Sequence, residues 1–437
     1  MAESRPSTRE TSSSLRTGRQ RRRWPFWVSL ALGIVAALLW IAQDQETLRV
    51  KSPVEASDPG FADYVASLLG APVEIGDAYT VLRNGDEAFP AMLDAIERAR
   101  SRIVFESYVV KDGEIGARWA AALEAAAKRG VTVRVVLDSI GSALSAKTQD
   151  RLEAAGVQVL WFNPVRFWQL EETNYRDHRK VLVVDGDVGF IGGMGIVDQW
   201  LGHAEDKAHW RDTQFKIVGP AVRALEASFY ENWLESGGES APVLDPELPA
   251  QETGARSIVV RSNAISGASN IKLLYLLAIA GARKTIDIHS PYVTLDPSSR
   301  WSLEEARRRG VRVRLVAESE GTDAMPVKHS IRHQYQELLD AGFEIAEYQP
   351  TMMHVKALII DGVFSLIGSA NFGNRSFEVN DELTVAAADA ELAATLTSHF
   401  EDDLRRSKKL DARTWKDQRS IVGKAQEFFW SFFGEIF

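Results

Sequence analysis

A short polar motif occurs twice in this chain and restricts its possible folds more than any other feature. His178-Arg179-Lys180, four apolar residues and Asp185 are matched by His354-Val355-Lys356, four apolar residues and Asp361. Each apolar run ends in an Asp-Gly turn, which is typical of a buried strand. Residues i and i+2 of a strand face one side, so each His and Lys can contact the same ligand. One copy alone would suit a solvated strand end, but two copies indicate one shared active site.

The repetition extends beyond the motif. Residues 123–136 are echoed by residues 303–316, and residues 154–159 are echoed by residues 340–345. Each segment reads as a helix that ends near a glycine and is followed by a strand, which is typical of βαβ units. The sequence therefore predicts an α/β fold with two duplicated lobes, each a mostly parallel mixed sheet flanked by helices.

A second apolar segment follows each motif and ends in a corner of small residues. The first corner contains Gly192 and Gly193, and the second contains Gly368 and Ser369. Small residues allow the backbone to approach a ligand closely. We therefore expect Gly193 and Ser369 to bind substrate.

These motifs resemble those of the phospholipase D superfamily, and within it the bacterial cardiolipin synthases. The resemblance covers nearly everything after the N-terminal apolar segment. The synthase branch is indicated by four further stretches, at residues 174–180, 210–213, 219–222 and 375–382. The resemblance implies that the two lobes pack with pseudo-twofold symmetry and that the two motifs meet at their interface.

The resemblance also implies a mechanism that suits a phosphodiester, which needs cations, a nucleophile and an acid for the leaving alkoxide. His178 is expected to attack phosphorus and His354 to act as acid and base, although the reverse order stays open. Lys180 and Lys356 would bind the non-bridging oxygens through charge-assisted hydrogen bonds. Neither a metal ion nor another cofactor is implied.

Carboxylates elsewhere are expected to orient the two histidines, because a hydrogen bond to one ring nitrogen leaves the other unprotonated. The resemblance assigns this role to Asp212 and Glu382. For Asp212 the alternative is a salt bridge at a strand end, with Arg211. Asp185 and Asp361 complete the catalytic motif, but we interpret them as structural residues that close the turn.

One position breaks the symmetry between the halves. Asn371 resembles a phosphate-contacting asparagine of the family, whereas Gly195 occupies the matching position in the first half. A symmetric phosphate clamp is therefore not expected.

Residues 24–42 form an uncharged, largely apolar run that follows Arg21, Arg22 and Arg23. About 20 apolar residues cross a bilayer, so we expect one membrane-spanning helix rather than a cleaved signal peptide. The positive-inside rule predicts a cytoplasmic N-terminus and extracytoplasmic lobes. A peripheral or re-entrant segment with cytoplasmic lobes is the alternative.

Membrane contact is also suggested by aromatic residues at the other end of the chain. Phe428, Phe429, Trp430, Phe432 and Phe433 fall on one side of an expected helix, which would either enter the bilayer interface or pack on the second lobe. The aromatic stretch at 161–168 would line an acyl entrance or belong to the core.

Seven segments are thus predicted along the chain. They are a basic cytoplasmic tail (1–23), a transmembrane anchor (24–42), a tether (43–60), a first lobe (61–235), a linker (236–255), a second lobe (256–412) and an amphipathic tail (413–437).

Charge and composition narrow the substrate. The formal net charge is −9, and the first 23 residues carry seven Arg against two Glu, which leaves −14 for the remainder. A nuclease usually has a basic track, so nucleic acid is not the expected partner. The chain has no cysteine, which excludes disulfides and thiolate chemistry.

The predicted function is membrane-bound phosphatidyl transfer, in which two phosphatidylglycerol molecules give cardiolipin and glycerol through a phosphohistidine. The alternatives are a phospholipase D that transfers to water or another alcohol, a phosphodiesterase acting on nucleic acid, and a non-catalytic lipid-binding protein. Acceptor choice depends on pocket shape, so the motifs alone do not separate them.

Overall fold

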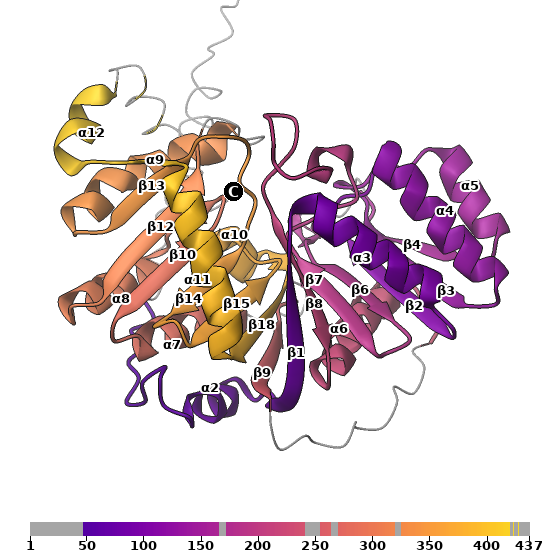
Figure 1. The fold of residues 1–437 in the computed structure, drawn as a ribbon, viewed down its shortest axis with the longest axis horizontal. Coiled ribbons are helices and arrows are strands. Elements are labelled where there is room, and N and C mark those ends of the chain that lie inside the picture. Colours follow the sequence, from indigo (N-terminus) through magenta and orange to yellow (C-terminus); the bar gives the residue numbers. More distant parts are fainter. Residues whose placement is uncertain are drawn as a thin grey trace, which may run out of the picture. The chain divides into compact units, whose positions relative to one another are not determined.

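The computed structural model describes residues 47–165, 172–240, 254–263, 270–319, 325–419, 423 and 427 (Figure 1). The predicted anchor at 24–42 lies outside these residues, as do most of the linker and the aromatic residues from Phe428 onward in the C-terminal tail. Among the described residues, no helix combines the length and the apolar character needed to cross a bilayer.

One sheet of fifteen strands runs through both halves of the described chain. The first half contributes β1 (Glu74–Arg83), β2 (Arg102–Ser107), β3 (Thr132–Asp138), β4 (Gln158–Phe162), β6 (Lys180–Val184), β7 (Val188–Gly192) and β8 (Thr213–Val218). The second half contributes β9 (Ala255–Arg261), β10 (Thr285–His289), β12 (Arg312–Glu318), β13 (Glu344–Tyr348), β14 (Ala357–Ile360), β15 (Phe364–Gly368), β18 (Leu383–Ala388) and β19 (Ser407–Lys409).

The two halves repeat one strand order. It runs β1-β8-β7-β6-β2-β3-β4 in the first half and β9-β18-β15-β14-β10-β12-β13 in the second, with β19 added at the edge. β1 pairs with β9, so the halves share a continuous sheet rather than forming a separate one each. The predicted α/β class is confirmed, while pseudo-twofold packing of the lobes stays a prediction.

The sheet is mixed, as predicted, but the prediction that it is mostly parallel is wrong. Only β2-β3-β4 and β10-β12-β13 pair in parallel, and the other neighbours in the sheet are antiparallel. The reason lies in the connections. Helical crossovers join the parallel strands, whereas the turn at Asp185 and Gly186 leads β6 directly back into β7, which produces an antiparallel pair.

Helices cover both faces of this sheet (Figure 1). They are α2 (Phe61–Leu69), α3 (Asn84–Arg98), α4 (Glu114–Lys128), α5 (Ala146–Ala154), α6 (Ala221–Glu235), α7 (Asn270–Gly281), α8 (Pro297–Arg308), α9 (Met325–Asp340), α10 (Asn374–Glu378), α11 (Ala390–Arg405) and α12 (Ala412–Gln418). Polar caps fix several starts; the Asp389 carboxylate, for example, accepts hydrogen bonds from two backbone N–H groups of α11.

The strand residues alternate between two cores, as the period of a strand requires. On β6, Leu182 and Val184 pack with α3 and α4, whereas Val181 and Val183 belong to a core that includes α6 and α11. This second core combines side chains from both halves, such as Phe229 and Ile359. Burying an apolar side chain of this size stabilises the fold by about 1.5–3 kcal/mol, so the shared core holds the halves together.

α2 contributes to the core of the second half. Phe61 is buried there and its ring meets Phe364 edge-on, with the ring centroids 5.0 Å apart. α2 also contacts α7. The chain therefore reaches the second half before it enters β1 and builds the first.

Candidate active site

Backbone pairing brings each motif against the other half, through two short strands for the first motif and a single bridge between Arg211 and Met353 for the second. β5 (Arg176–Asp177), directly before the first His, pairs in parallel with β17 (Asn380–Asp381). The backbone N–H of His178 donates to the carbonyl of Asp381 at 2.9 Å, and that of His354 donates to the carbonyl of Arg211 at 2.7 Å. Each His therefore lies beside the residue that precedes the carboxylate of the opposite half.

This arrangement forms two histidine–carboxylate pairs, and both cross between the halves. Nδ1 of His178 lies 2.8 Å from Oε1 of Glu382, and Nδ1 of His354 lies 2.9 Å from Oδ2 of Asp212. Both carboxylates are fully buried. Because the carboxylate accepts a hydrogen bond from Nδ1–H, Nε2 of the neutral ring carries no proton and is available for chemistry.

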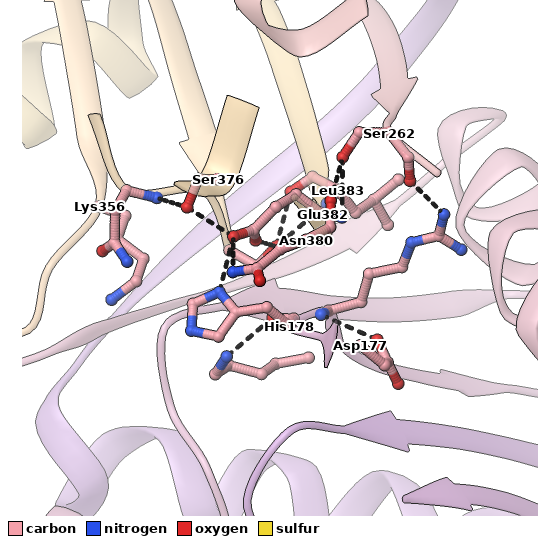
Figure 2. Close-up of polar contacts among 12 residues, drawn as sticks. Asp177, His178, Ser262, Lys356, Ser376, Asn380, Glu382 and Leu383 are labelled. Carbon is pink, nitrogen blue, oxygen red and sulfur yellow. Dashed lines mark hydrogen bonds and ion pairs between the residues drawn. The ribbon is translucent and has the colours of Figure 1, made fainter. Parts of the chain in front are cut away.

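Further donors hold the two carboxylates in place. Figure 2 shows Ser376 and Asn380 converging with His178 on Glu382. The hydroxyls of Ser376 and Ser369 donate to Glu382 at 2.6 and 2.5 Å. Asp212 instead accepts from the indole N–H of Trp200 at 2.9 Å. Ser369 therefore lies behind Glu382, and it is absent from the described lining of the cavity where a substrate would bind.

Two buried lysines accompany the histidines. Nζ of Lys180 donates to the carbonyl of His178 at 2.8 Å, and Nζ of Lys356 lies 3.2 Å from Nε2 of His354. Burial lowers the pKa of Lys180 to about 8, against the attraction of Glu382 and other carboxylates. Both ammonium groups suit the binding of a phosphate between the histidines.

Burial also controls the charge of the histidine–carboxylate pairs. It lowers the pKa of His178 to about 4, opposed by the attraction of Glu382, and it lowers the pKa of His354, reinforced by Lys356. Burial alone would raise the pKa of Glu382, but His178, Lys180 and Ser369 together lower it to about 2. In the free protein at neutral pH, these values indicate neutral imidazoles and an ionised Glu382.

Asp185 and Asp361 lie at the far end of their strands from the histidines. Both have left-handed backbone, with φ of 57° and 53°. Asp185 accepts backbone hydrogen bonds from residues 100–102, and Asp361 accepts equivalent bonds from residues 283–285. The contacts of both carboxylates thus fasten the strand turn to a neighbouring segment, and neither reaches the substrate cavity.

The remaining expected residues have distinct positions. Gly193 permits a close approach, because a Cβ there would lie 2.6 Å from the Asp212 carboxylate and 2.8 Å from the His354 carbonyl. Asn371 lines the cavity, whereas its counterpart Gly195 packs against Val109. Arg211 forms a salt bridge with Asp403, while the Asp212 side chain contacts His354.

A cavity of 520 Å³ opens over both histidines. Its wall near His354 is aromatic, with the Trp200 and Trp210 ring centroids 5.3 and 5.8 Å from the imidazole. Near His178 lie Tyr108, at 5.2 Å between centroids, and a more polar wall from the second half. The chemical groups are duplicated, but their surroundings are not.

Comparison with known proteins shows which family the chain belongs to. The family described as "Cardiolipin synthase, PLD-like domain" matches residues 92–231 and 275–404. The chain belongs to this family. The predicted phospholipase D relationship, and with it an enzyme of phospholipase D type, is thereby confirmed.

Curated cardiolipin synthases are among the relatives of this family member. Cardiolipin synthase 2 of Bacillus anthracis is 37% identical over 350 residues, which cover 77% of this chain and 66% of that protein. A cardiolipin synthase of Geobacillus thermodenitrificans is 36% identical over 345 residues, covering 78% and 68%. The chain therefore spans about two thirds of the length of these relatives.

Solved structures support the fold of this cardiolipin synthase-like chain. The phosphatidylserine synthase of Haemophilus influenzae Rd KW20 aligns with a TM-score of 0.66 at 13% identity, over 86% of this chain and 97% of that one. The polyphosphate kinase of Porphyromonas gingivalis aligns with a TM-score of 0.51 at 13% identity, over 89% and 56%. At this identity the likeness concerns the fold.

Two neighbours of the histidine–carboxylate pairs were not predicted from the sequence. Trp200 and Ser376 each donate to one of the buried carboxylates. Each lies seven residues after the corner position of its own half, Gly193 or Ser369. Aligning the repeats on their corners would have identified them as equivalent, although a Trp and a Ser share no obvious chemistry.

Proposed function

We propose that this protein is a membrane-bound phosphatidyltransferase that converts two molecules of phosphatidylglycerol into cardiolipin and glycerol. The observation that carries the proposal is the pair of crossed histidine–carboxylate contacts over one cavity, in a chain of the cardiolipin synthase family. Neither half could supply such a site alone, because each histidine depends on a carboxylate from the other half.

The first step forms the covalent intermediate. Nε2 of one histidine attacks phosphorus of the donor lipid, and the bond from phosphorus to the glycerol headgroup oxygen breaks. The other histidine is neutral in the free protein and would take up a proton at Nε2 when the anionic phosphate binds beside it; it gives this proton to that oxygen, so glycerol leaves as a neutral alcohol. The resemblance favours His178 as nucleophile and His354 as acid. Glu382 and Asp212 would stabilise the imidazolium forms.

The second step returns the enzyme to its starting state. The primary hydroxyl of a second phosphatidylglycerol gives its proton to the acid–base histidine, and its oxygen attacks phosphorus. The phosphorus–nitrogen bond breaks and cardiolipin leaves. Water in the place of this hydroxyl would give phosphatidic acid, so acceptor binding decides the product.

Lys180 and Lys356 would hold the non-bridging oxygens throughout. Negative charge increases on these oxygens in the transition state, where two ammonium donors in a buried site are most effective. Asn371 lines the same cavity and would add a neutral donor. The charge balance disfavours nucleic acid as substrate, because the chain after residue 23 carries a formal charge of −14.

The anchor at 24–42 would hold the enzyme in the membrane, with the N-terminus in the cytoplasm and both lobes outside it. The basic residues before the apolar run support this orientation. The seven predicted segments remain our proposed division of the chain. A C-terminal reporter that is active only outside the cytoplasm should give signal, and a silent but expressed fusion would contradict the topology.

The proposed reaction can be tested with detergent-purified full-length protein and phosphatidylglycerol. We expect cardiolipin and glycerol in equal amounts, with little phosphatidic acid. Phosphatidic acid and glycerol without cardiolipin would identify a hydrolase instead. No turnover of lipid, with cleavage of single-stranded DNA, would favour a nuclease.

A further inference from the structure

The cavity is more cationic than one phosphate requires. Four basic side chains line it, namely Lys111, Arg176, Lys180 and Arg375, and the described lining includes no Asp or Glu. Lys180 serves the reacting phosphate in the proposed function. Arg176 is buried and lies 3.5 Å from the Asp138 carboxylate, so part of its charge is offset. Lys111 is exposed to solvent, whereas Arg375 is half-buried.

Arg375 is held firmly over the His178 side of the cavity. It belongs to α10, whose next residue, Ser376, donates to Glu382. Its guanidinium donates to the carbonyl and side-chain oxygens of Asn174 in the other half, at 3.1 and 3.0 Å. These two oxygens of Asn174 are uncharged. Burial lowers the pKa of Arg375, which means that its charge is poorly solvated and would be stabilised by a bound anion.

Two amide oxygens add hydrogen-bonding capacity beside this arginine. Asn371 and Asn380 line the cavity, and Oδ1 of each is buried without a hydrogen-bond partner among the described residues. A buried acceptor without a partner costs free energy, so such groups commonly mark a position where a ligand donates. A glycerol hydroxyl is a suitable donor.

The first half has no equivalent of this arginine. Arg375 lies six residues after the corner position Ser369, and Gln199 lies six residues after Gly193. Gln199 also lines the cavity but carries no charge. Both halves contain the histidine–carboxylate pair, whereas only the second half places this additional, half-buried cation at the cavity. A reaction between two lipids contains one phosphate beyond the reacting phosphate.

Resting on the proposed function, we propose that Arg375, Asn371 and Asn380 form a subsite for the phosphoglycerol group of the acceptor lipid. Arg375 would bind the acceptor's phosphate while Lys180 and Lys356 hold the reacting phosphate, and the amide oxygens would accept from the glycerol between them. Holding the acceptor in this way would favour its hydroxyl over water.

The test compares two acceptors of the same intermediate. Arg375→Gln, Arg375→Lys and Lys111→Gln are assayed for cardiolipin synthesis and for exchange of labelled glycerol into phosphatidylglycerol. Glycerol carries no phosphate, so it does not need Arg375. We expect Arg375→Gln to lower synthesis at least tenfold relative to exchange, because a charge-assisted contact is lost. Arg375→Lys should fall between it and wild type, and Lys111→Gln should keep the wild-type ratio within twofold.

The outcomes separate this inference from the proposed function. If the wild type makes cardiolipin but Arg375→Gln keeps its ratio, or loses both activities equally, the subsite is overturned and the synthase function stands. A selective loss in Lys111→Gln alone would move the subsite to that lysine and also overturn the proposal. If the wild type exchanges glycerol without making cardiolipin, the synthase function and the subsite fail together. Should Arg375→Gln not fold, Arg375→Lys gives the same comparison.

Discussion

The two half-sites around His178 and His354 contain the same reacting groups in different surroundings. Each has a buried carboxylate on Nδ1 and a buried lysine two residues after the histidine. Around His178 the carboxylate accepts from two serine hydroxyls and the cavity wall carries Arg375. Around His354 the carboxylate accepts from an indole, and two Trp rings border the imidazole.

This contrast separates what the chemistry requires from what the substrate requires. The parts that repeat are those that any phosphodiester transfer by two histidines needs, namely the base, its orienting carboxylate and the cation. The parts that differ line the cavity, where they can distinguish one headgroup or acyl chain from another. A duplicated chain can therefore keep two copies of its chemistry and specialise their surroundings.

The largest expected effect comes from removing either histidine. His178→Ala and His354→Ala should each reduce cardiolipin synthesis by at least about 1,000-fold, because one loses the nucleophile and the other the acid. The double variant should be no worse than either single one, since the residues act as a unit. Initial rates of glycerol release measure this, and near-normal activity in either single variant would break the shared-site account.

Removing the charge of one carboxylate should have the next largest effect. Glu382→Gln and Asp212→Asn should each lower kcat by about 100-fold or more, because the imidazole loses the partner that fixes its tautomer. Asp187→Asn, an exposed position, is the matched control. The difference between the two losses in kcat measures how differently the two half-sites depend on their carboxylates. An unchanged kcat in either variant would show that the substituted carboxylate does not orient its histidine.

The pH dependence tests the lysine on the His178 side. Lys180 is protonated below its pKa of about 8 and loses its charge as the pH rises through that value. The kcat/KM of the free enzyme should therefore fall about tenfold per pH unit above 8. Lys180→Arg keeps its charge at high pH, so its kcat/KM should not fall above pH 8, even if its maximal rate is lower. If kcat/KM of Lys180→Arg still falls above pH 8, the titrating group is not Lys180.

A smaller effect is expected from the donors behind the carboxylates. Trp200→Phe removes the indole hydrogen bond to Asp212 and should lower kcat by about tenfold. Ser376→Ala should cost less, because Ser369 still donates to Glu382. Trp233→Phe is the matched control, since its indole nitrogen is buried without a hydrogen-bond partner among the described residues. Equal losses in all three variants would point to packing rather than to these hydrogen bonds.

The smallest effect on the rate is expected at the two motif aspartates. Asp185→Ala and Asp361→Ala each leave backbone N–H groups without their acceptor and should lower the free energy of unfolding by about 1–3 kcal/mol. Denaturant unfolding measures this, with Asn substitutions as controls that tolerate the left-handed φ. A rate loss as large as that of Glu382→Gln, in fully folded protein, would contradict a structural role.

The placement of the histidines and lysines follows from the sequence because it depends on local geometry. A strand period of two places His178 with Lys180, and the duplication indicates a second copy. The crossing of Glu382 to His178 does not follow from the sequence, since it depends on how distant segments pair. The sequence over-predicts parallel pairing because the repeated helix–strand segments are conspicuous, while the tight turn after β6 is only three residues of sequence.

The sequence also does not show whether a residue at a small-residue corner faces the substrate cavity or the carboxylate behind it. Ser369 was expected beside the substrate, yet its hydroxyl is buried against Glu382. A small polar residue at a corner can face the cavity or the carboxylate behind it, and only tertiary packing decides between them.

The central claim is that both half-sites form one active site in which the histidines have different roles. It is tested most directly by quenching the full-length enzyme during turnover of phosphatidylglycerol labelled in its phosphate, then mapping the protein-bound label by peptide mass spectrometry. The account predicts an acid-labile label on the His178 peptide, lost in His178→Ala. A protein that turns over substrate without any bound label, or with label on both histidines equally, would contradict it.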